Sequence, residues 1–276
     1  MMIARACLVI PLLFSCQDSK SAQDAGSSSH DAAPDGSTDA SPANDAPALV
    51  DAALARPLRI MVLGDSISEG SSTANTYRSH LFFDLRDAEL SFDFVGDNQG
   101  TCGNINAGIN DGWDADHSSF FSATAEQILG GMMPVNACSP AGSGNIHDWA
   151  PTYAADIAIL HLGTNDCRGG ANATQIQDRL AGIIAELRDA VPSVKIIVAQ
   201  IISSRLGNLN SCVLSLNTSL PAWVSGESTA LSPIVLVDQH SGWDANAYQR
   251  DAYHPNEIGA RRMADRFLPA VRAFFP

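Results

Sequence analysis

The chain has 276 residues, of which 45% are hydrophobic and 17% charged, and its formal net charge is −14. From about Pro57 to Pro276 it carries 13 Lys and Arg against 23 Asp and Glu. A surface this acidic lacks the basic patch that binds a phosphate backbone, so we expect no nucleic acid partner. The 220 residues of that stretch are enough for one sizeable core, and we expect one folded domain there.

The first sixteen residues predict export. Arg5 precedes an apolar run from Ala6 to Phe14, which is too short to span a bilayer and is typical of a secretory signal. We therefore expect a secreted, periplasmic or outer-surface protein. The residues before Cys16 resemble a bacterial lipobox, in which the Cys is lipidated and anchors the mature chain to a membrane. The alternative is an ordinary signal that is cleaved near Ala22, and the sequence leaves both open.

Residues 17–56 are predicted to form a disordered linker rich in Ala, Ser, Asp and Pro. Between residues 17 and 48 there is no aromatic residue and no aliphatic one larger than Ala. Such a segment cannot bury enough apolar surface to offset the entropy lost on ordering. The folded domain is expected to span residues 57–276.

Short apolar runs alternate with helical patterns along this domain. Because the runs show no polar alternation, they are typical of strands buried on both faces of a parallel sheet. We therefore predict an α/β fold, a three-layer α/β/α sandwich with a five-stranded parallel sheet. The expected strands are Leu58–Leu63, Phe92–Val95, Ile157–Leu162, Val194–Ile202 and Ile234–Val237.

Two helices are predicted most clearly. The first is capped by Thr174 and buries the apolar face formed by Ile176, Leu180, Ile183, Ile184 and Leu187. The second begins near Asn256 and is expected to kink or end at Pro269. Its buried face is formed by Ala260, Met263, Ala264, Phe267 and Leu268.

Four cysteines remain in the folded region: Cys102, Cys138, Cys167 and Cys212. An even number in an exported protein predicts disulfides, and four cysteines allow three pairings. We favour Cys102–Cys138 and Cys167–Cys212, since the two loops of each pair would lie at the same edge of the sheet.

Three polar motifs follow predicted strands or precede the last helix. They are Gly64-Asp65-Ser66-Ile67-Ser68, Gly163-Thr164-Asn165-Asp166 and Asp251-Ala252-Tyr253-His254-Pro255. Ligands of doubly wound sheets bind beyond the carboxyl ends of the strands, where these loops would meet. Each motif alone is more typical of a helix cap or turn, and the coincidence of all three indicates a site.

The motifs, in this order over residues 58–268, resemble those of the SGNH (GDSL) hydrolases, serine esterases with a flavodoxin-like fold. Within that superfamily the chain looks closest to carbohydrate esterase family three, which is associated with acetyl xylan esterases. This narrower resemblance rests on Thr76-Tyr77-Arg78, Phe92-Asp93-Phe94-Val95-Gly96, Asp114-Ala115-Asp116-His117 and Thr124-Ala125-Glu126-Gln127-Ile128-Leu129.

The resemblance implies that Ser66 is the nucleophile, His254 the general base and Asp251 the carboxylate that orients the imidazole. The oxyanion donors would be the backbone N–H of Ser66, the side-chain amide of Asn165 and a backbone N–H of a middle loop. In that loop the chain has Ser122 where the family has glycine. Ser122 can serve if the glycine is not needed for a positive φ, and Gly108 or Gly112 are the alternatives.

Other residues have smaller expected roles. Asp65 and Asp166 are expected to brace the two catalytic loops rather than react. Tryptophans in predicted loops either stack on a sugar ring or pack in the core, and packing is the commoner use. These are Trp113, Trp149 and Trp243.

The resulting expectation is an exported serine esterase that removes a short acyl group, most simply acetyl, from a carbohydrate. The expected partner is a small acyl ester or an acetylated polysaccharide, with no cofactor and no metal, and the oligomeric state is left open. One alternative is a non-catalytic glycan-binding surface lipoprotein. The other is a metal-dependent phosphoesterase. Its ligands would be Asp65, Asp114, Asp116, His117, Asp251 and His254.

Overall fold

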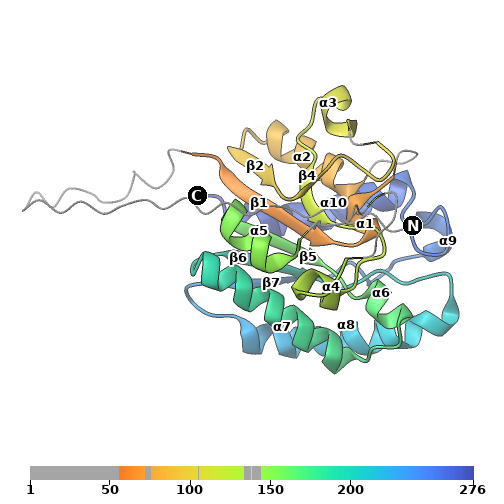
Figure 1. Ribbon diagram of the computed structural model, residues 1–276. Coiled ribbons are helices and arrows are strands. Elements are labelled where there is room, and N and C mark those ends of the chain that lie inside the picture. Colours follow the sequence, from red (N-terminus) through yellow and green to blue (C-terminus); the bar gives the residue numbers. More distant parts are fainter. Residues whose placement is uncertain (1–55, 72–75, 105, 134–137, 139–143) are drawn as a thin grey trace, which may run out of the picture. The chain divides into compact units, whose positions relative to one another are not determined.

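The computed structural model of the protein describes residues 56–71, 76–104, 106–133, 138 and 144–276 (Figure 1). The expected signal over residues 1–16, with Cys16, lies outside the described residues. The same is true of the expected linker over residues 17–56, except for its last residue.

The centre of the molecule is a parallel sheet in the order β2-β1-β5-β6-β7. This is the strand order of flavodoxin-like folds, and it confirms the predicted α/β sandwich. All five expected strands are present, and β6 is shorter than the apolar run that predicted it. Their bounds are β1 (Leu58–Gly64), β2 (Phe92–Val95), β5 (Ile157–His161), β6 (Lys195–Ala199) and β7 (Ile234–Val237).

Two short strands that the sequence did not predict extend the sheet beside β1. They are β3 (Asn98–Gln99) and β4 (Asp116–Ser119), and within the described residues they bring the sheet to seven strands. β1 pairs with β2 along its first half and with β4 at Leu63 and Gly64. β4 therefore brings the chain that follows it to the carboxyl end of β1, where the nucleophile motif begins.

Helices cover both faces of the sheet (Figure 1). One face packs against α4 (Ala125–Leu129), α5 (Ile146–Tyr153), α7 (Ala173–Ala190) and α8 (Gly207–Glu227). The other face packs against α2 (Tyr77–Asp87) and α10 (Glu257–Arg272). The remaining helices are short: α1 (Ser66–Glu69), α3 (Ala107–Asp111), α6 (Thr164–Arg168) and α9 (Ala245–Tyr248). Among the described helices none is both long and apolar enough to cross a membrane.

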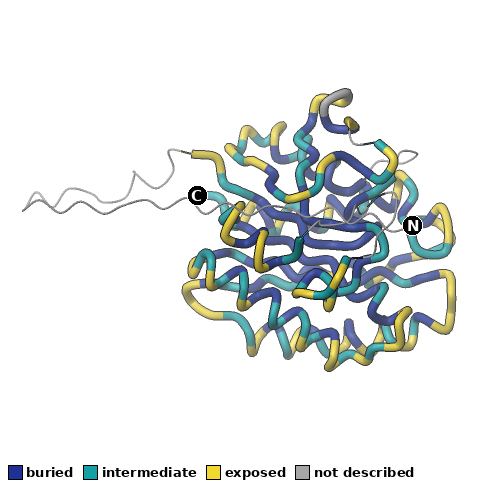
Figure 2. The backbone as a smooth tube through the Cα atoms, viewed as in Figure 1, coloured by how far each residue is buried: buried dark blue, intermediate teal, exposed yellow. Residues whose placement is uncertain are grey.

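The core divides between the two faces of the sheet, as Figure 2 shows in the buried central strands. Along β1, Ile60 and Val62 contact the α2 and α10 side, while Met61 and Leu63 contact the α7 and α8 side. A strand buried on both faces has no polar side to alternate with, which is why β1 is apolar without interruption from Ile60 to Leu63.

The two predicted helices are present with corrections at their ends. The predicted buried face of α7 is confirmed, but the N-cap is Asn172 and not Thr174. Asn172 and Gln175 form a capping box, in which each side chain accepts a hydrogen bond from the other residue's backbone N–H. Asn256 caps α10 as expected, and that helix continues through Pro269 to Arg272.

Both predicted disulfides are present. Cys102 is bonded to Cys138, and Cys167 in α6 is bonded to Cys212 in α8. The second bond ties α6, which begins at Thr164, to a long helix of the outer layer. It therefore fixes one of the loops at the carboxyl end of the sheet.

Candidate active site

The nucleophile motif forms a tight turn from β1 into α1. Gly64 is required there, because a Cβ on it would lie 2.2 Å from the Ser68 hydroxyl oxygen. Asp65 caps α1 by accepting a hydrogen bond from the backbone N–H of Ile67 at 2.9 Å. Ser66 is therefore the first residue of the helix, a position whose N–H has no partner within the helix itself. Its residue surface is 9% exposed.

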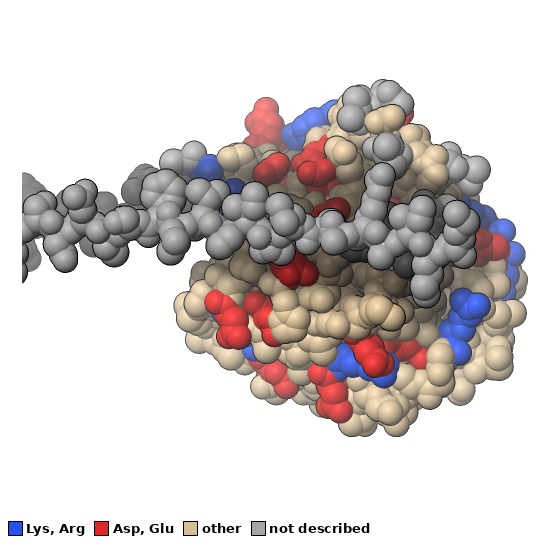
Figure 3. Space-filling view, viewed as in Figure 1, with Lys and Arg blue, Asp and Glu red and all other residues tan. Residues whose placement is uncertain are grey.

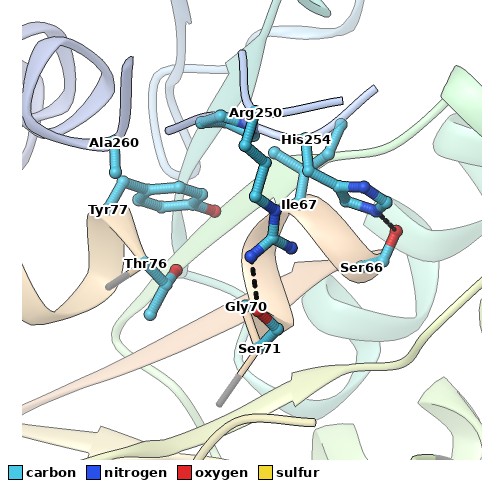
Figure 4. Close-up of a pocket in the computed structure, with 10 residues that line it drawn as sticks. Ser66, Ile67, Gly70, Ser71, Thr76, Tyr77, Arg250, His254 and Ala260 are labelled. Atoms are coloured by element: carbon cyan, nitrogen blue, oxygen red, sulfur yellow. Dashed lines mark hydrogen bonds between the residues drawn. The ribbon is translucent and has the colours of Figure 1, made fainter. Parts of the chain in front are cut away.

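The motif of the last loop supplies the imidazole. Asp251 accepts hydrogen bonds from the backbone N–H groups of Tyr253 and His254, each at 2.8 Å. Its other carboxylate oxygen lies 2.8 Å from Nδ1 of His254. On the far side of the ring, Nε2 lies 2.9 Å from Oγ of Ser66, and Figure 4 shows the two side chains pointing toward each other. The expected meeting of these three residues is thus present in the structure.

The electrostatics of Asp251 favour its ionised form. Partial burial acts to raise its pKa, but the hydrogen bonds from His254 and Tyr253 outweigh burial and lower the pKa below its usual value. An ionised carboxylate on Nδ1 keeps the proton on that nitrogen, which leaves Nε2 free to accept one from Ser66.

The middle loop lies between β4 and α4. Its backbone turns sharply, since Ala123 donates to the carbonyl of Phe120 at 3.0 Å, and Ser122 adopts a φ of +66°. Ser122 lines the same pocket as Ser66 and His254. The described lining includes neither Gly108, which lies in α3, nor Gly112, which ends that helix. Ser122 is therefore the residue of the middle block that reaches the site, in a conformation that favours glycine.

Asn165 connects this loop to the turn that carries Asp65 and Ser66. Its Nδ2 donates to the carbonyl of Ala123 at 3.0 Å and lies 3.3 Å from the Asp65 carboxylate. Asp166 accepts from the backbone N–H of Ala125 at 2.9 Å, at the start of α4. The expected bracing of the loops by Asp65 and Asp166 is therefore present.

Burial raises the pKa of Asp65 to about 7, and the neighbouring charge of Asp166 acts in the same direction. Asp65 is thus close to half protonated near neutral pH, because its side chain is shielded from water under the nucleophile. Asp65 accepts hydrogen bonds from Ile67 and Asn165, so it lies between the turn of Ser66 and the loop of Asn165. The side chain is fully buried and does not face the open side of the pocket.

The space around the Ser66 and His254 pair is unequal on its two sides. On the side of Tyr77 and Arg250, shown in Figure 4, the cavity measures about 10 Å³, which is room for about one water molecule. On the side of Phe121 and Tyr253 the cavity measures about 150 Å³. A cavity of that volume accepts a molecule the size of benzene. Of these two described cavities, the second is the one that fits the larger group of a substrate.

Sequence reasoning missed two buried ionisable side chains beneath the site. Arg78 is fully buried and donates to four backbone carbonyls, those of Ser68, Glu69, Gly100 and Ala115, at 2.6 to 3.0 Å. It therefore ties the segment of Ser68 and Glu69 to both ends of the connection between β3 and β4. The one sequence signal for Arg78 was its place in the Thr76-Tyr77-Arg78 block. We used that block only as part of the family resemblance.

Glu69 is the second missed residue. Its surface is 2% exposed, and its carboxyl group accepts hydrogen bonds from the Asn98 side chain and from the backbone N–H of Phe121, the neighbour of Ser122. Burial raises the pKa of Glu69 to about 8, although the positive charge of Arg78 acts against it. The residue joins the nucleophile helix to the middle loop.

Several expected side chains do not enter the pocket. The three tryptophans are buried, so packing is their observed use: Trp113 lies under Arg78, Trp149 stacks on Phe120 and Trp243 contacts Tyr248. The hypothetical metal ligands of a phosphoesterase are not gathered. Within the described residues the one group of three such side chains is Glu69 with the disulfide-bonded Cys102 and Cys138.

Comparison with known families agrees with this geometry. The profile of the GDSL-like Lipase/Acylhydrolase family matches residues 62–262. The chain belongs to this family.

Solved structures of acetyl esterases are similar to it. A carbohydrate esterase of family 3 from Talaromyces cellulolyticus is 29% identical with a TM-score of 0.66, covering 78% of this chain and 97% of that one. An acetyl esterase mutant solved with an acetate ion gives the same values. The family 3 carbohydrate esterase of Clostridium thermocellum, 24% identical with a TM-score of 0.60, shares the fold. It covers 79% of this chain and 98% of that one.

A multidomain esterase of Ruminococcus flavefaciens is 27% identical over 225 residues. The match covers 79% of this chain but 29% of that protein, so the chain spans less than a third of the relative's length. Together with the family match, these similarities confirm the predicted SGNH-type carboxylic ester hydrolase. Where the GDSL family is expected to carry glycine, this esterase has Ser122 at a positive φ.

Proposed function

We propose that this GDSL esterase is exported and removes acetyl or other short acyl groups from carbohydrate, with Ser66, His254 and Asp251 as its catalytic residues. The observation that carries the proposal is the 2.9 Å distance between Oγ of Ser66 and Nε2 of His254, with Asp251 on the opposite ring nitrogen. A serine is a weak nucleophile until a base at this distance takes its proton. Likeness to the family 3 carbohydrate esterases supports the choice of substrate.

The reaction begins when Oγ of Ser66 attacks the ester carbonyl carbon and its proton passes to Nε2 of His254. The carbonyl oxygen becomes an oxyanion, stabilised by the backbone N–H groups of Ser66 and Ser122 and by Nδ2 of Asn165. The amide of Asn165 exchanges its 3.3 Å contact with Asp65 for this bond and keeps its bond to Ala123. Collapse of this intermediate expels the alcohol, which takes the proton from His254 and leaves Ser66 acylated. Water then attacks the acyl group by the same steps, which releases the acid and restores the serine.

The size of the cavities supports a small acyl group. One side of Ser66 has room for about one water molecule and the other for about one ring. Neither of these two cavities has the volume of a long fatty acyl chain, whereas the methyl of an acetyl group on one side and a sugar ring on the other fit. We therefore expect the rate to fall steeply as the acyl chain lengthens.

The test is hydrolysis of p-nitrophenyl esters from acetate to octanoate, and of acetylated xylan, by the full-length protein and its variants. Ser66→Ala should lower kcat by more than about 10⁴-fold, as loss of a triad member does in other serine hydrolases. Ser211→Ala, at an exposed position on α8, is the matched control and should retain activity. A fully active Ser66→Ala protein would exclude this mechanism, and a preference for octanoate would exclude the acetyl assignment.

A further inference from the structure

We propose that Arg168 forms a subsite for a carboxylate on the substrate, so that the preferred substrate is an acylated carbohydrate that carries a uronic acid. This inference rests on the proposed function, because it assigns the substrate of the same pocket. It concerns the part of the substrate that remains with the alcohol and not the acyl group.

Arg168 ends α6 and lines the larger cavity together with Ser66 and His254. Among the described residues that line this cavity, it is the one with a permanent charge. No described carboxylate lines the cavity beside it. The larger group of the substrate therefore meets a single cation there.

The guanidinium of Arg168 is held without being neutralised. Its central carbon lies 5.9 Å from the centre of the Tyr253 ring, in a cation–π contact that restrains the side chain. In the part of the chain that the structure describes, no carboxylate forms an ion pair with it. The two acids near α6 are already paired elsewhere, since Arg179 binds both Asp166 and Glu126. The N–H donors of Arg168 remain available to a ligand.

Most other arginines of the described chain are committed to protein acceptors. Arg250, on the opposite side of His254, donates to the Ser71 hydroxyl across the small cavity (Figure 4). It also lies 3.7 Å from Asp251. Arg78 donates to four backbone carbonyls. Among the described arginines that border the site, Arg168 is therefore the one whose N–H donors are available to a ligand.

The guanidinium of Arg168 favours a carboxylate as its ligand. A guanidinium is planar and presents paired N–H donors that match the two oxygens of a carboxylate. The domain carries 13 Lys and Arg against 23 Asp and Glu, and Figure 3 shows acidic side chains scattered over the visible face. Because this net charge repels anions, an anionic glycan needs a local cation to be held near Ser66. Arg168 supplies it at the mouth of the cavity that admits a sugar ring.

The experiment compares two substrates that differ by one charge. The first is an acetylated methyl uronoside, and the second is the same compound with its carboxyl group as a methyl ester. For the full-length protein we expect kcat/KM to be about fivefold higher on the free acid, the upper end for a partly exposed ion pair. The ratio of the two rates within one protein sample does not depend on the fraction that is folded.

Three variants complete the test. Arg168→Gln should bring the ratio to about one or below, and Arg168→Lys should keep only part of it, since lysine retains the charge without the paired donors. Arg272→Gln removes an exposed arginine at the end of α10 and should leave the ratio unchanged. A ratio near one in the unaltered protein, or a preference for the acid that survives in Arg168→Gln, would overturn the proposal.

Hydrolysis of p-nitrophenyl acetate separates the two hypotheses. If the protein cleaves this ester but shows no preference between the uronoside and its methyl ester, the carboxylate subsite is wrong and the proposed esterase stands. If the protein cleaves neither this ester nor the sugars, the proposed function itself fails. A sulfated sugar preferred over the uronoside would show an anion subsite of another chemistry and would overturn the carboxylate assignment.

Discussion

Replacing Glu69 with Gln tests the charge state of the buried carboxyl group that links the nucleophile helix to the middle loop. Glu69 is 2% exposed, and burial raises its pKa to about 8 despite the nearby guanidinium of Arg78. Near pH 6 the group is therefore protonated. Glutamine has nearly the same shape and is neutral, so Glu69→Gln should change the free energy of unfolding little below about pH 4.5, where the unfolded chain also keeps its proton.

The size of the effect follows from the shift in pKa from 4.5 to about 8. Between these values the folded protein keeps a proton that the unfolded chain has lost, so rising pH destabilises the fold. The loss is about 1.4 kcal/mol per pH unit and on the order of 5 kcal/mol in total. The variant lacks this titration, whereas its other ionisable groups titrate as in the unaltered protein. The stability of the variant relative to the unaltered protein should therefore rise from pH 5 to pH 8 and level off above.

Urea denaturation of both full-length proteins at pH 5, 6, 7, 8 and 9 measures this difference. Glu126→Gln, at a side chain that is 65% exposed, is the matched control, and its difference should stay within about 0.5 kcal/mol. If Glu69 is instead ionised and paired with Arg78, Glu69→Gln should cost about 3 to 5 kcal/mol at every pH. That result would refute the assignment of a protonated carboxyl group.

Three further changes test other parts of the site. Asn165→Ala should lower kcat on p-nitrophenyl acetate by about 10² to 10³, because it removes one oxyanion donor; an unchanged kcat would contradict that role. Ser122→Gly should keep kcat within a few-fold and raise the free energy of unfolding by up to about 1 kcal/mol, since glycine accepts the φ of +66° without strain. A large loss of kcat would instead assign a role to the serine side chain. Replacing Cys167 and Cys212 together with Ser should lower the free energy of unfolding by about 4 kcal/mol, from the 45-residue separation that the disulfide closes; unchanged stability would contradict this estimate.

The five main strands could be predicted because their centres are buried and their sequences are mostly apolar, with charged residues such as Arg59, Asp93 and Lys195 confined to the first two positions of a strand. β3 and β4 could not, because their sequences Asn98–Gln99 and Asp116–Ser119 are polar and their pairing depends on the position of β1. The cap of α7 was misplaced by two residues, since both Asn172 and Thr174 are residue types that cap helices. Only the backbone decides between them.

The meeting of Ser66, His254 and Asp251 could be predicted, because the first motif follows β1 and the family resemblance implies that the motif before α10 lies beside it. The residues beneath them could not be. Glu69 and Arg78 are charged, and charged side chains are expected at the surface unless a partner is known. The family's glycine raised the question of a positive φ at Ser122, but nothing in Phe120-Phe121-Ser122-Ala123 answered it. Such features depend on contacts between segments distant in the chain.

Chemical labelling of Ser66 tests the proposed mechanism most directly. The full-length protein is treated with a fluorophosphonate, and the modified residue is located by peptide mass spectrometry while activity is followed. We predict a single adduct on Ser66, activity lost in proportion to it, and little labelling in His254→Ala, where no base activates the hydroxyl. Full activity in protein labelled completely at Ser66, or loss of activity with Ser66 unmodified, would contradict the account.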